Sequence, residues 1–205
     1  MAGIHGGSEG NAIKLANQFI NYLTDEPESI PPDITLFIIP VLNPDGEARG
    51  NGSNGRLNEN GVDLNRNWPY NWQSQWDQDG CWRDLPVSAG THPASEPETM
   101  SLMFFLQHHP IDAMISYHCC ALGVFAGGVP PYQPSIDLAE MVSGMSSYQF
   151  PPTDTGCPYF GNLTDWASSI GIASVDLELT DPFSTEFEQN ARILRSFLEW
   201  RPISP

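Results

Sequence analysis

Three short apolar runs, separated by helical patterns, constrain the fold of this chain most strongly. They occupy residues 34–41, 113–118 and 172–179. Continuous runs of branched apolar residues are typical of strands that are buried on both faces. Apolar residues at helical spacing predict helices around them, over residues 11–23, 94–106, 136–146, 163–169 and 186–200. This alternation predicts an α/β fold, with a mixed, largely parallel sheet flanked by helices on both faces.

Local signals predict where several of these elements begin and end. Asn43-Pro-Asp-Gly46 predicts a turn after the first run, and an Asn- and Gly-rich loop follows it to about residue 60. Ser95, with Glu98 three residues later, predicts a capping box at the start of the helix over residues 94–106.

Composition places the chain among packed globular proteins. Its 205 residues, 40% of them hydrophobic, suffice for one domain over residues 1–205. The net charge of −17 reflects scarce bases, because Lys14 is accompanied by only seven arginines. Such a surface repels nucleic acid and anionic membranes, so we expect neither as a partner. The charge suits a cationic substrate or an extracellular habitat, and we favour the second explanation.

The chain carries no targeting or membrane signal that we recognise. It lacks the run of about 18 apolar residues that a membrane span needs, and it has no signal peptide. The location therefore stays unknown, although the acidic balance favours the extracellular space or the periplasm.

The four cysteines do not form a zinc-finger pattern. They contain no Cys-x-x-Cys pair, which argues against a structural zinc site. Cys119 and Cys120 are neighbours in an apolar stretch, and we expect buried thiols there rather than a bridge. A disulfide between Cys81 and Cys157 is left open.

Two histidines and a glutamate form a candidate metal site. His5 and Glu9 flank a Gly-rich turn, so they can offer one nitrogen and one carboxylate to the same divalent ion. His118 ends an apolar run and supplies a third ligand, which completes a His2Glu set of the kind found in catalytic zinc sites. Ligands of α/β sheets gather at the carboxyl ends of strands, where His118, Glu178 and the turn after residue 41 should converge.

Two acidic residues compete for the role of general base. Glu178 interrupts the apolar run over residues 172–179, and a carboxylate there needs a partner or a role because unpaired burial is unfavourable. Beside a zinc-bound water it would accept a proton. Asp176 lies on the same strand face by the two-residue period, so the pattern alone leaves both open.

The scarce arginines are the natural anion binders of the chain. Arg66 stands between Asn65 and Asn67, a setting suited to clamping a carboxylate. Arg56 can stabilise a developing oxyanion. Alternatively, both arginines neutralise the nearby Asp63 and Glu59.

Taken in order, these motifs resemble the carboxypeptidase A-like zinc metallopeptidases, the zinc carboxypeptidase family. The resemblance spans essentially the whole chain. It runs from His5 and Glu9, through Asn43-Pro-Asp-Gly46, Arg56-x-Asn58-x-x-Gly61-Val-Asp-Leu-Asn65-Arg66-Asn67 and Ser95-Glu96-Pro-Glu98, to His118 and Leu177-Glu178-Leu179. The form of the central motif is similar to bacterial members that trim peptidoglycan peptides.

The resemblance implies a fold, a cofactor and a set of roles. The fold would be the three-layer α/β sandwich of the family, without its first strands. One Zn²⁺ would be held by His5, Glu9 and His118, with Glu178 as general base and Arg56 at the oxyanion. Asn65 and Arg66 would bind the free C-terminal carboxylate of a peptide substrate, which includes cell-wall peptides.

The chain departs from the family pattern at three positions and at its start. Glu9 is four residues after His5, where the family has three. The position of the active-site tyrosine falls on Cys157, with Tyr159 the nearest phenol, and the position that reads the substrate side chain falls on Thr164. Family members have further strands before the first ligand, so we expect the chain alone to be marginally stable and to bind zinc weakly.

Two other functions stay open beside a zinc carboxypeptidase. The same ligands would serve a zinc amidohydrolase or deacylase, although the Asn65–Arg66 clamp favours substrates with a free carboxylate. A degenerate, non-catalytic binding module would retain the fold alone, and the intact Glu178 argues against it.

Overall fold

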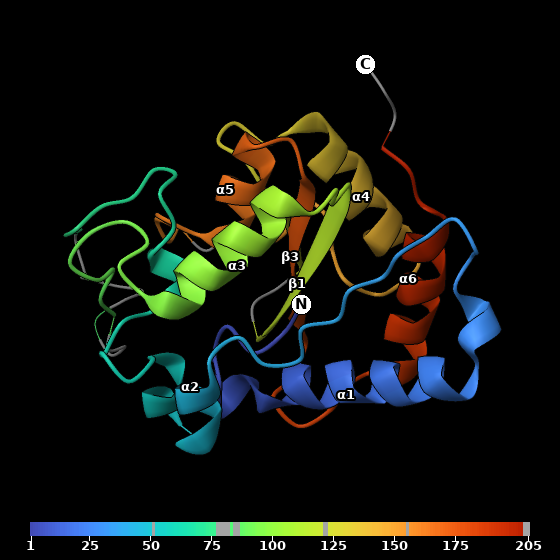
Figure 1. Cartoon of the computed structure of the whole chain (residues 1–205), viewed down its shortest axis with the longest axis horizontal. Helices are drawn as coiled ribbons and strands as arrows, with labels where there is room; N and C mark the ends of the chain where they lie inside the picture. Colours follow the sequence, from blue (N-terminus) through green and yellow to red (C-terminus); the bar gives the residue numbers. More distant parts are fainter. Residues whose placement is uncertain (51, 77–82, 84–86, 121–122, 155, 203–205) are drawn as a thin grey trace.

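The computed structural model describes the chain except for residues 51, 77–82, 84–86, 121–122, 155 and 203–205. Within the described part, three strands form one sheet: β1 (Ala113–Cys119), β2 (Val124–Ala126) and β3 (Ala173–Leu179). Their order is β1-β3-β2. β1 and β3 are parallel, and β2 is antiparallel to β3. The predicted α/β fold with a mixed sheet is therefore confirmed (Figure 1).

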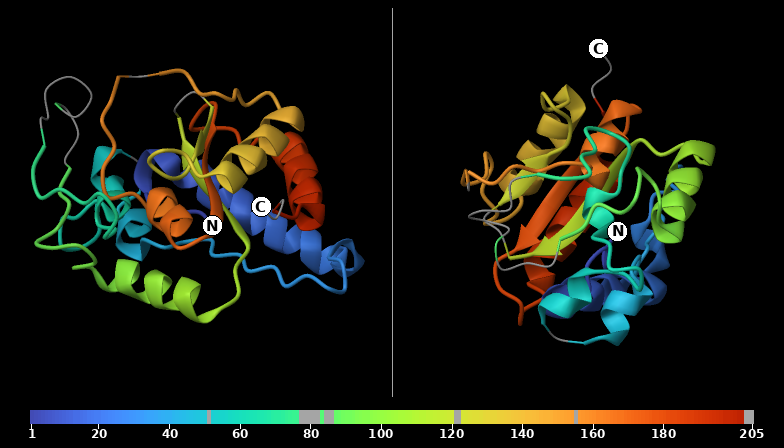
Figure 2. Two further views of the ribbon diagram at one scale, coloured as in Figure 1. Left: turned by 90° about the horizontal axis from the view of Figure 1, so that it is seen from above. Right: turned by 90° about the vertical axis from the view of Figure 1, so that its left-hand side faces the viewer.

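Helices cover both faces of this sheet (Figure 2). On one face, α1 (Gly10–Asp25), α4 (Gln133–Gly144) and α6 (Phe187–Glu199) enclose a first core. On the other face, α3 (Pro97–His108) and α5 (Leu163–Ser169) enclose a second core with Trp68. A short helix and four 3₁₀ turns connect them: α2 (Pro44–Ala48), η1 (Gly7–Glu9), η2 (Pro27–Ser29), η3 (Ser53–Arg56) and η4 (Leu64–Arg66).

Strand alternation separates apolar from polar side chains at the centre of the sheet. Ile115, Tyr117, Val175 and Leu177 belong to the first core. Because successive strand residues point to opposite faces, the residues between them point to the other side: Ser116, His118, Asp176 and Glu178. His118 and Glu178 are register partners near the carboxyl ends of their strands. The polar residues therefore converge on one face and one edge, as the sequence predicts.

The predicted strand over residues 34–41 is not a strand in the structure. The segment is extended, but its side chains are half-buried or exposed rather than buried on both faces, and Phe37 is 43% exposed. Residues 1–3 lie between it and β1: the nitrogen of Met1 donates to Ile115 O, and the nitrogen of Ala2 donates to Ile39 O. Within the described chain, residues 1–3 contact the segment only near its C-terminal end. Most of residues 34–41 therefore have no neighbouring strand.

A cavity of about 490 Å³ occupies the space between this segment and β1. Besides residues of α1 and β1, the lining includes Leu36 and Ile38 of the segment, Phe105 and Leu106 of α3, Phe197 of α6 and Trp200, which follows α6. The amino group of Met1 is buried against β1, where it donates to Ile115 O, and burial lowers its pKa to about 5. A charged amino group is poorly solvated in such a slot.

Two predictions at the ends of elements are also wrong. Ser95 is not an N-cap: α3 begins at Pro97, whose ring suits the first helical position, and Glu96 is the capping residue. Asn43-Pro-Asp-Gly46 starts the helix α2 rather than a simple turn, because the Asn43 side chain accepts from Gly46 N.

The cysteines also differ from expectation. Cys119 and Cys120 form a disulfide at the end of β1, where Cys120 is exposed, so the expected buried thiols are absent there. Cys157 is disulfide-bonded as well. Cys81 lies outside the described residues, and its pairing with Cys157 stays open.

Filling the slot beside Met1 should stabilise the fold and improve zinc uptake. We would fuse a short apolar strand to Met1, in register with β1. Burying one large apolar side chain contributes about 2 kcal/mol, and each kcal/mol shifts the melting temperature of a chain this size by about 2–4 °C, so we expect an increase of about 4–8 °C. A control extension with proline at alternate positions cannot donate to β1. Equal melting temperatures and equal zinc contents for the two fusions would contradict the expectation.

Candidate metal centre

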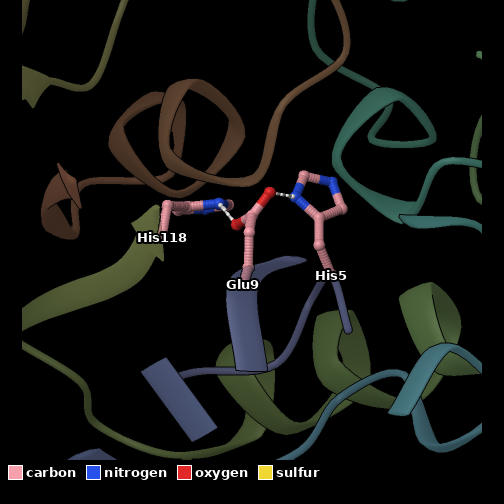
Figure 3. Close-up of side chains that lie close together, drawn as sticks. All are labelled: His5, Glu9 and His118. Carbon is pink, nitrogen blue, oxygen red and sulfur yellow. Dashed lines mark hydrogen bonds and ion pairs between the residues drawn. The ribbon is translucent and has the colours of Figure 1, made fainter. Parts of the chain in front are cut away.

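His5, Glu9 and His118 come together from three parts of the chain (Figure 3). His5 lies on the turn before η1, Glu9 immediately precedes α1, and His118 lies near the end of β1. His5 Nδ1 is 2.8 Å from Glu9 Oε1, and His118 Nδ1 is 3.1 Å from Glu9 Oε2. Their potential ligand atoms lie within 4.8 Å of one another, and all three residues are buried.

Two glycines allow the turn between His5 and Glu9. Gly7 has a φ of +64°, and a Cβ there would lie 2.2 Å from Gly52 O. A Cβ on Gly6 would lie 2.3 Å from the carbonyl carbon of Gly46. No side chain fits between these backbones. The turn accommodates the extra residue of this chain and still directs both side chains to one point.

The Glu9 carboxylate is held ionised by its neighbours. Burial opposes its charge, but His5 and His118 outweigh this and lower its pKa below the ordinary range. Cys119 N also donates to Glu9 Oε2, at 3.3 Å. Because Glu9 stands at the start of α1, the helix dipole favours its negative charge as well.

The outer nitrogens of both histidines face carboxylates. His5 Nε2 is 2.8 Å from Asp63 Oδ1, whereas His118 Nε2 lies 3.0 Å from Ser116 Oγ and 3.3 Å from Asp176 Oδ1. Histidine ligands of metals usually donate their second N–H to such partners, which fixes the ring orientation. Two Nδ1 atoms and one carboxylate, oriented in this way, fit a zinc-type ion.

Asp63 is the site residue that the sequence analysis missed. The sequence suggests Asp63 only as a charge partner of arginine, and its Oδ2 does accept from Arg56 Nε at 2.8 Å. Its other oxygen orients His5. Burial opposes its ionisation, but Arg56 and His5 hold its pKa well below the usual value. Its place within the Gly61-to-Asn67 motif was the available signal.

Arg56 lies at the border between the donor set and solvent. Its Nη1 is 3.5 Å from Glu9 Oε1, and 17% of its side chain is exposed. Burial opposes its charge, but Asp63, Glu9 and Glu178 together raise its pKa. The alternative interpretation of Arg56 as a partner of Asp63 thus describes a real contact. Glu59 instead pairs with Arg49, at 2.8 Å.

Asn65 and Arg66 lie on η4 beside the same site. The side-chain oxygen of Asn65, Oδ1, accepts from Leu163 N at 2.9 Å, and the Asn65 backbone N–H donates to Asp63 Oδ1. Arg66 is 4% exposed, and its guanidinium carbon lies 5.5 Å from the centre of the Tyr159 ring. Burial lowers the pKa of Arg66, and Asp63 partly opposes this effect. A buried cation is therefore stacked on a partly exposed phenol.

Asp176 and Glu178 differ in their surroundings although they share a strand face. Asp176 Oδ2 accepts from Thr164 Oγ1 at 2.9 Å, and its other oxygen faces His118. Thr164 is itself buried in α5, with its hydroxyl engaged by Asp176. Glu178 is half-buried opposite His118. Asp176 thus serves as a partner of His118.

Comparison with known families decides the affiliation of the chain. Residues 1–198 match the family described as zinc carboxypeptidase. The chain belongs to this family. Membership classes it as a zinc-dependent hydrolase of the metallopeptidase type, as the sequence motifs predict.

Its relatives include both amidases and carboxypeptidases. Murein peptide amidase A of Escherichia coli K12 is 25% identical over 211 residues, which cover 98% of this chain and 79% of the relative. Carboxypeptidase A4 of Mus musculus is 26% identical over 200 residues, which cover 83% of this chain and 47% of the relative.

Solved structures show the same fold. The murein-tripeptide amidase of Escherichia coli O157 superposes with a TM-score of 0.70 at 23% identity, covering 99% of this chain and 81% of that one. Carboxypeptidase A of Helicoverpa armigera superposes with a TM-score of 0.66 at 17% identity, and the match covers 97% of this chain and 60% of that one. No helix in the described part of the chain is long and apolar enough to cross a membrane.

Replacing Asp63 by asparagine should weaken zinc binding. The amide would present an N–H to Arg56 Nε, and its oxygen is a weaker acceptor for His5. Loss of such outer partners typically lowers metal affinity by about 10–100-fold. Zinc affinity can be measured by competition with a chelator. The control is Glu59→Gln, which removes an exposed carboxylate of the same loop, and equal dissociation constants for the two variants would contradict the role of Asp63.

Proposed function

We propose that this chain is a zinc-dependent carboxypeptidase that hydrolyses the C-terminal bond of peptides with a free carboxylate. The observation that carries the proposal is the position of a buried His2Glu donor set beside two arginines of one loop segment, residues 56–66. The donor set and Arg56 would act on the peptide bond that is hydrolysed, and Arg66 would bind the terminal carboxylate of the substrate.

His5 Nδ1, His118 Nδ1 and the Glu9 carboxylate would hold one Zn²⁺. When bound, such an ion lowers the pKa of a coordinated water and polarises a carbonyl. Asp63 forms a hydrogen bond with Nε2 of His5, and Ser116 forms one with Nε2 of His118. The protein thereby directs the same nitrogen of each histidine toward the centre.

Glu178 is the proposed general base. Its carboxylate would take a proton from the attacking water and deliver it to the leaving nitrogen. Its half-buried position opposite His118 supports this role. Asp176 is less suited, because Thr164 and His118 already contact its two oxygens. Arg56, whose charge is stabilised by Asp63 and Glu9, would stabilise the oxyanion.

Asn65 and Arg66 would bind the terminal carboxylate of the substrate. Arg66 is buried next to Tyr159, and a desolvated guanidinium binds a carboxylate strongly. Tyr159 is 37% exposed, so its hydroxyl can reach a bound peptide. Thr164 is buried with its hydroxyl on Asp176, so it would form the floor of the pocket for the side chain of the leaving residue.

A cell-wall peptide is the substrate class that the relatives favour. Two of the named relatives are described as murein peptide amidases. For this chain we therefore propose peptidoglycan peptides as substrates, with an extracellular or periplasmic location. A zinc amidohydrolase is the second candidate, because the same two relatives are named as amidases rather than carboxypeptidases.

Glu178→Gln should sharply lower turnover. Removing a positioned general base typically lowers the rate by about 10²–10⁴-fold. The zinc-loaded protein would be assayed against hippuryl dipeptides, γ-glutamyl cell-wall peptides and N-acyl amino acids, and the preferred class separates the two candidates. The control is Glu188→Gln, an exposed acid on α6. A fall of less than about tenfold in Glu178→Gln would falsify the assigned base.

Arg66→Gln should raise KM for substrates with a free carboxylate. Loss of charged hydrogen bonds lowers affinity by about tenfold to a hundredfold. Peptides with an amidated C-terminus should bind the wild type and the variant equally weakly. Arg192→Lys, on the exposed face of α6, serves as the control. An unchanged KM for free-acid peptides would show that Arg66 does not bind the terminal carboxylate.

A further inference from the structure

The proposed function leaves part of the sequence motifs without a role. Asn58 belongs to the motif that contains Arg56, and Ser95-Glu96 precedes α3. Asn58 and Glu96 are 38 positions apart in the sequence, yet a buried hydrogen bond joins their side chains. The contact lies where the loop carrying Arg56 and Asp63 meets the start of α3.

The Glu96 carboxylate is the centre of this contact. Glu96 is 4% exposed, and its Oε2 accepts from Asn58 Nδ2 at 2.7 Å and from Asn60 Nδ2 at 2.8 Å. Its Oε1 accepts from Ser95 Oγ at 2.6 Å. Three neutral donors thus stabilise one buried carboxylate. Burial opposes its ionisation, but these hydrogen bonds outweigh it and lower the pKa of Glu96, so it is ionised at neutral pH.

Asn58 passes this restraint on to the rest of its loop. Its side-chain oxygen accepts from the backbone N–H groups of Asn60 and Val62, at 3.1 Å and 3.0 Å. The backbone N–H of Asn58 donates to Val62 O at 2.9 Å. Both ends of the Asn58 amide are therefore used. The amide oxygen closes the loop on itself, whereas the amide nitrogen ties the loop to Glu96 at 2.7 Å and, at the longer distance of 3.2 Å, to Glu98 Oε2.

The two residues at the ends of this closed loop are the ones that act at the metal centre. Arg56 precedes Asn58 by two positions, and Asp63 directly follows Val62. They contact one another at 2.8 Å, and Asp63 in turn orients His5. A shift of the loop would move both side chains together, whereas α3 is anchored in the second core by Leu102 and Leu106.

We propose that Glu96 is a positioning residue, which ties the Asn58 loop to α3 and thereby holds Arg56 and Asp63 at the metal centre. The kinetic part of this inference rests on the proposed function. Glu96 touches neither substrate nor ion. Its effect should appear in the chemical step and in zinc affinity, and less in substrate binding.

The test compares Glu96→Ala with Glu96→Gln. Misplacement of a catalytic group by about 1 Å can lower the rate by about a hundredfold, so we expect kcat to fall by about 10–100-fold in Glu96→Ala. KM should change little, because Arg66 does not belong to the closed loop. The zinc dissociation constant should rise by about tenfold as Asp63 loses its hold on His5. Glu96→Gln keeps one oxygen that can accept from Asn58 and Asn60. This variant should therefore retain most of the kcat and most of the zinc affinity that Glu96→Ala loses.

A stability control separates positioning from general loss of structure. Leu106→Ala removes a buried side chain at the other end of α3 and should lower the melting temperature without changing kcat or zinc affinity. Should Glu96→Ala not fold, Asn60→Ala removes one donor from an exposed residue and should give a smaller change in the same direction. Parallel behaviour of the Glu96 and Leu106 variants, or no rescue by glutamine, would overturn the inference.

The two proposals can fail separately. Wild-type protein that binds zinc but cleaves no substrate of the three classes would refute the proposed function. The zinc dissociation constants would then still decide on Glu96, because they need no turnover. Conversely, an active wild type with an unaffected Glu96→Ala variant would refute only the positioning role.

Discussion

The burial of one carboxylate, Glu9, between two imidazoles is the interaction on which the rest of the site depends. A buried charge is tolerated only when it is paired and hydrogen-bonded. Here the pairing requires a turn without side chains at Gly6 and Gly7, the start of a helix at Glu9, and the end of a strand at His118. Each of these elements belongs to a different part of the fold, so the packing of the whole sheet determines the site.

Further charges extend outward from this pair in an alternating order. The His5 ring contacts the carboxylate of Asp63, and Asp63 contacts the guanidinium of Arg56. Arg56 in turn forms an ion pair with Glu9. On the other side, His118 is followed by Asp176, which is fixed by Thr164. Neutral amides complete the arrangement around Glu96. Motif residues such as Asp63 and Asp176 are therefore needed as partners of the buried charged groups, because each buried ionised group needs its own hydrogen bonds.

Much of the fold follows from local pattern. The helices and the strands β1 and β3 lie within a few residues of their predicted positions, because apolar periodicity reports directly on burial. The prediction fails where burial depends on a neighbour. Residues 34–41 have the composition of a buried strand, yet most of this segment has no adjacent strand in the described chain. Ser95 has the spacing of a capping box, but its hydroxyl is used by Glu96 and Asn67.

The sequence by itself determined which chemical groups are available and in which order they occur. His5, Glu9, His118, Arg56, Arg66 and Glu178 could all be named from residue type, spacing and position at the ends of strands. Only the tertiary structure decided how they pair. Asp63 lies 58 positions from His5, and Glu9 lies 109 positions from His118. Contacts over such separations are set by sheet register and loop closure, which depend on the packing of the entire chain rather than on any local pattern.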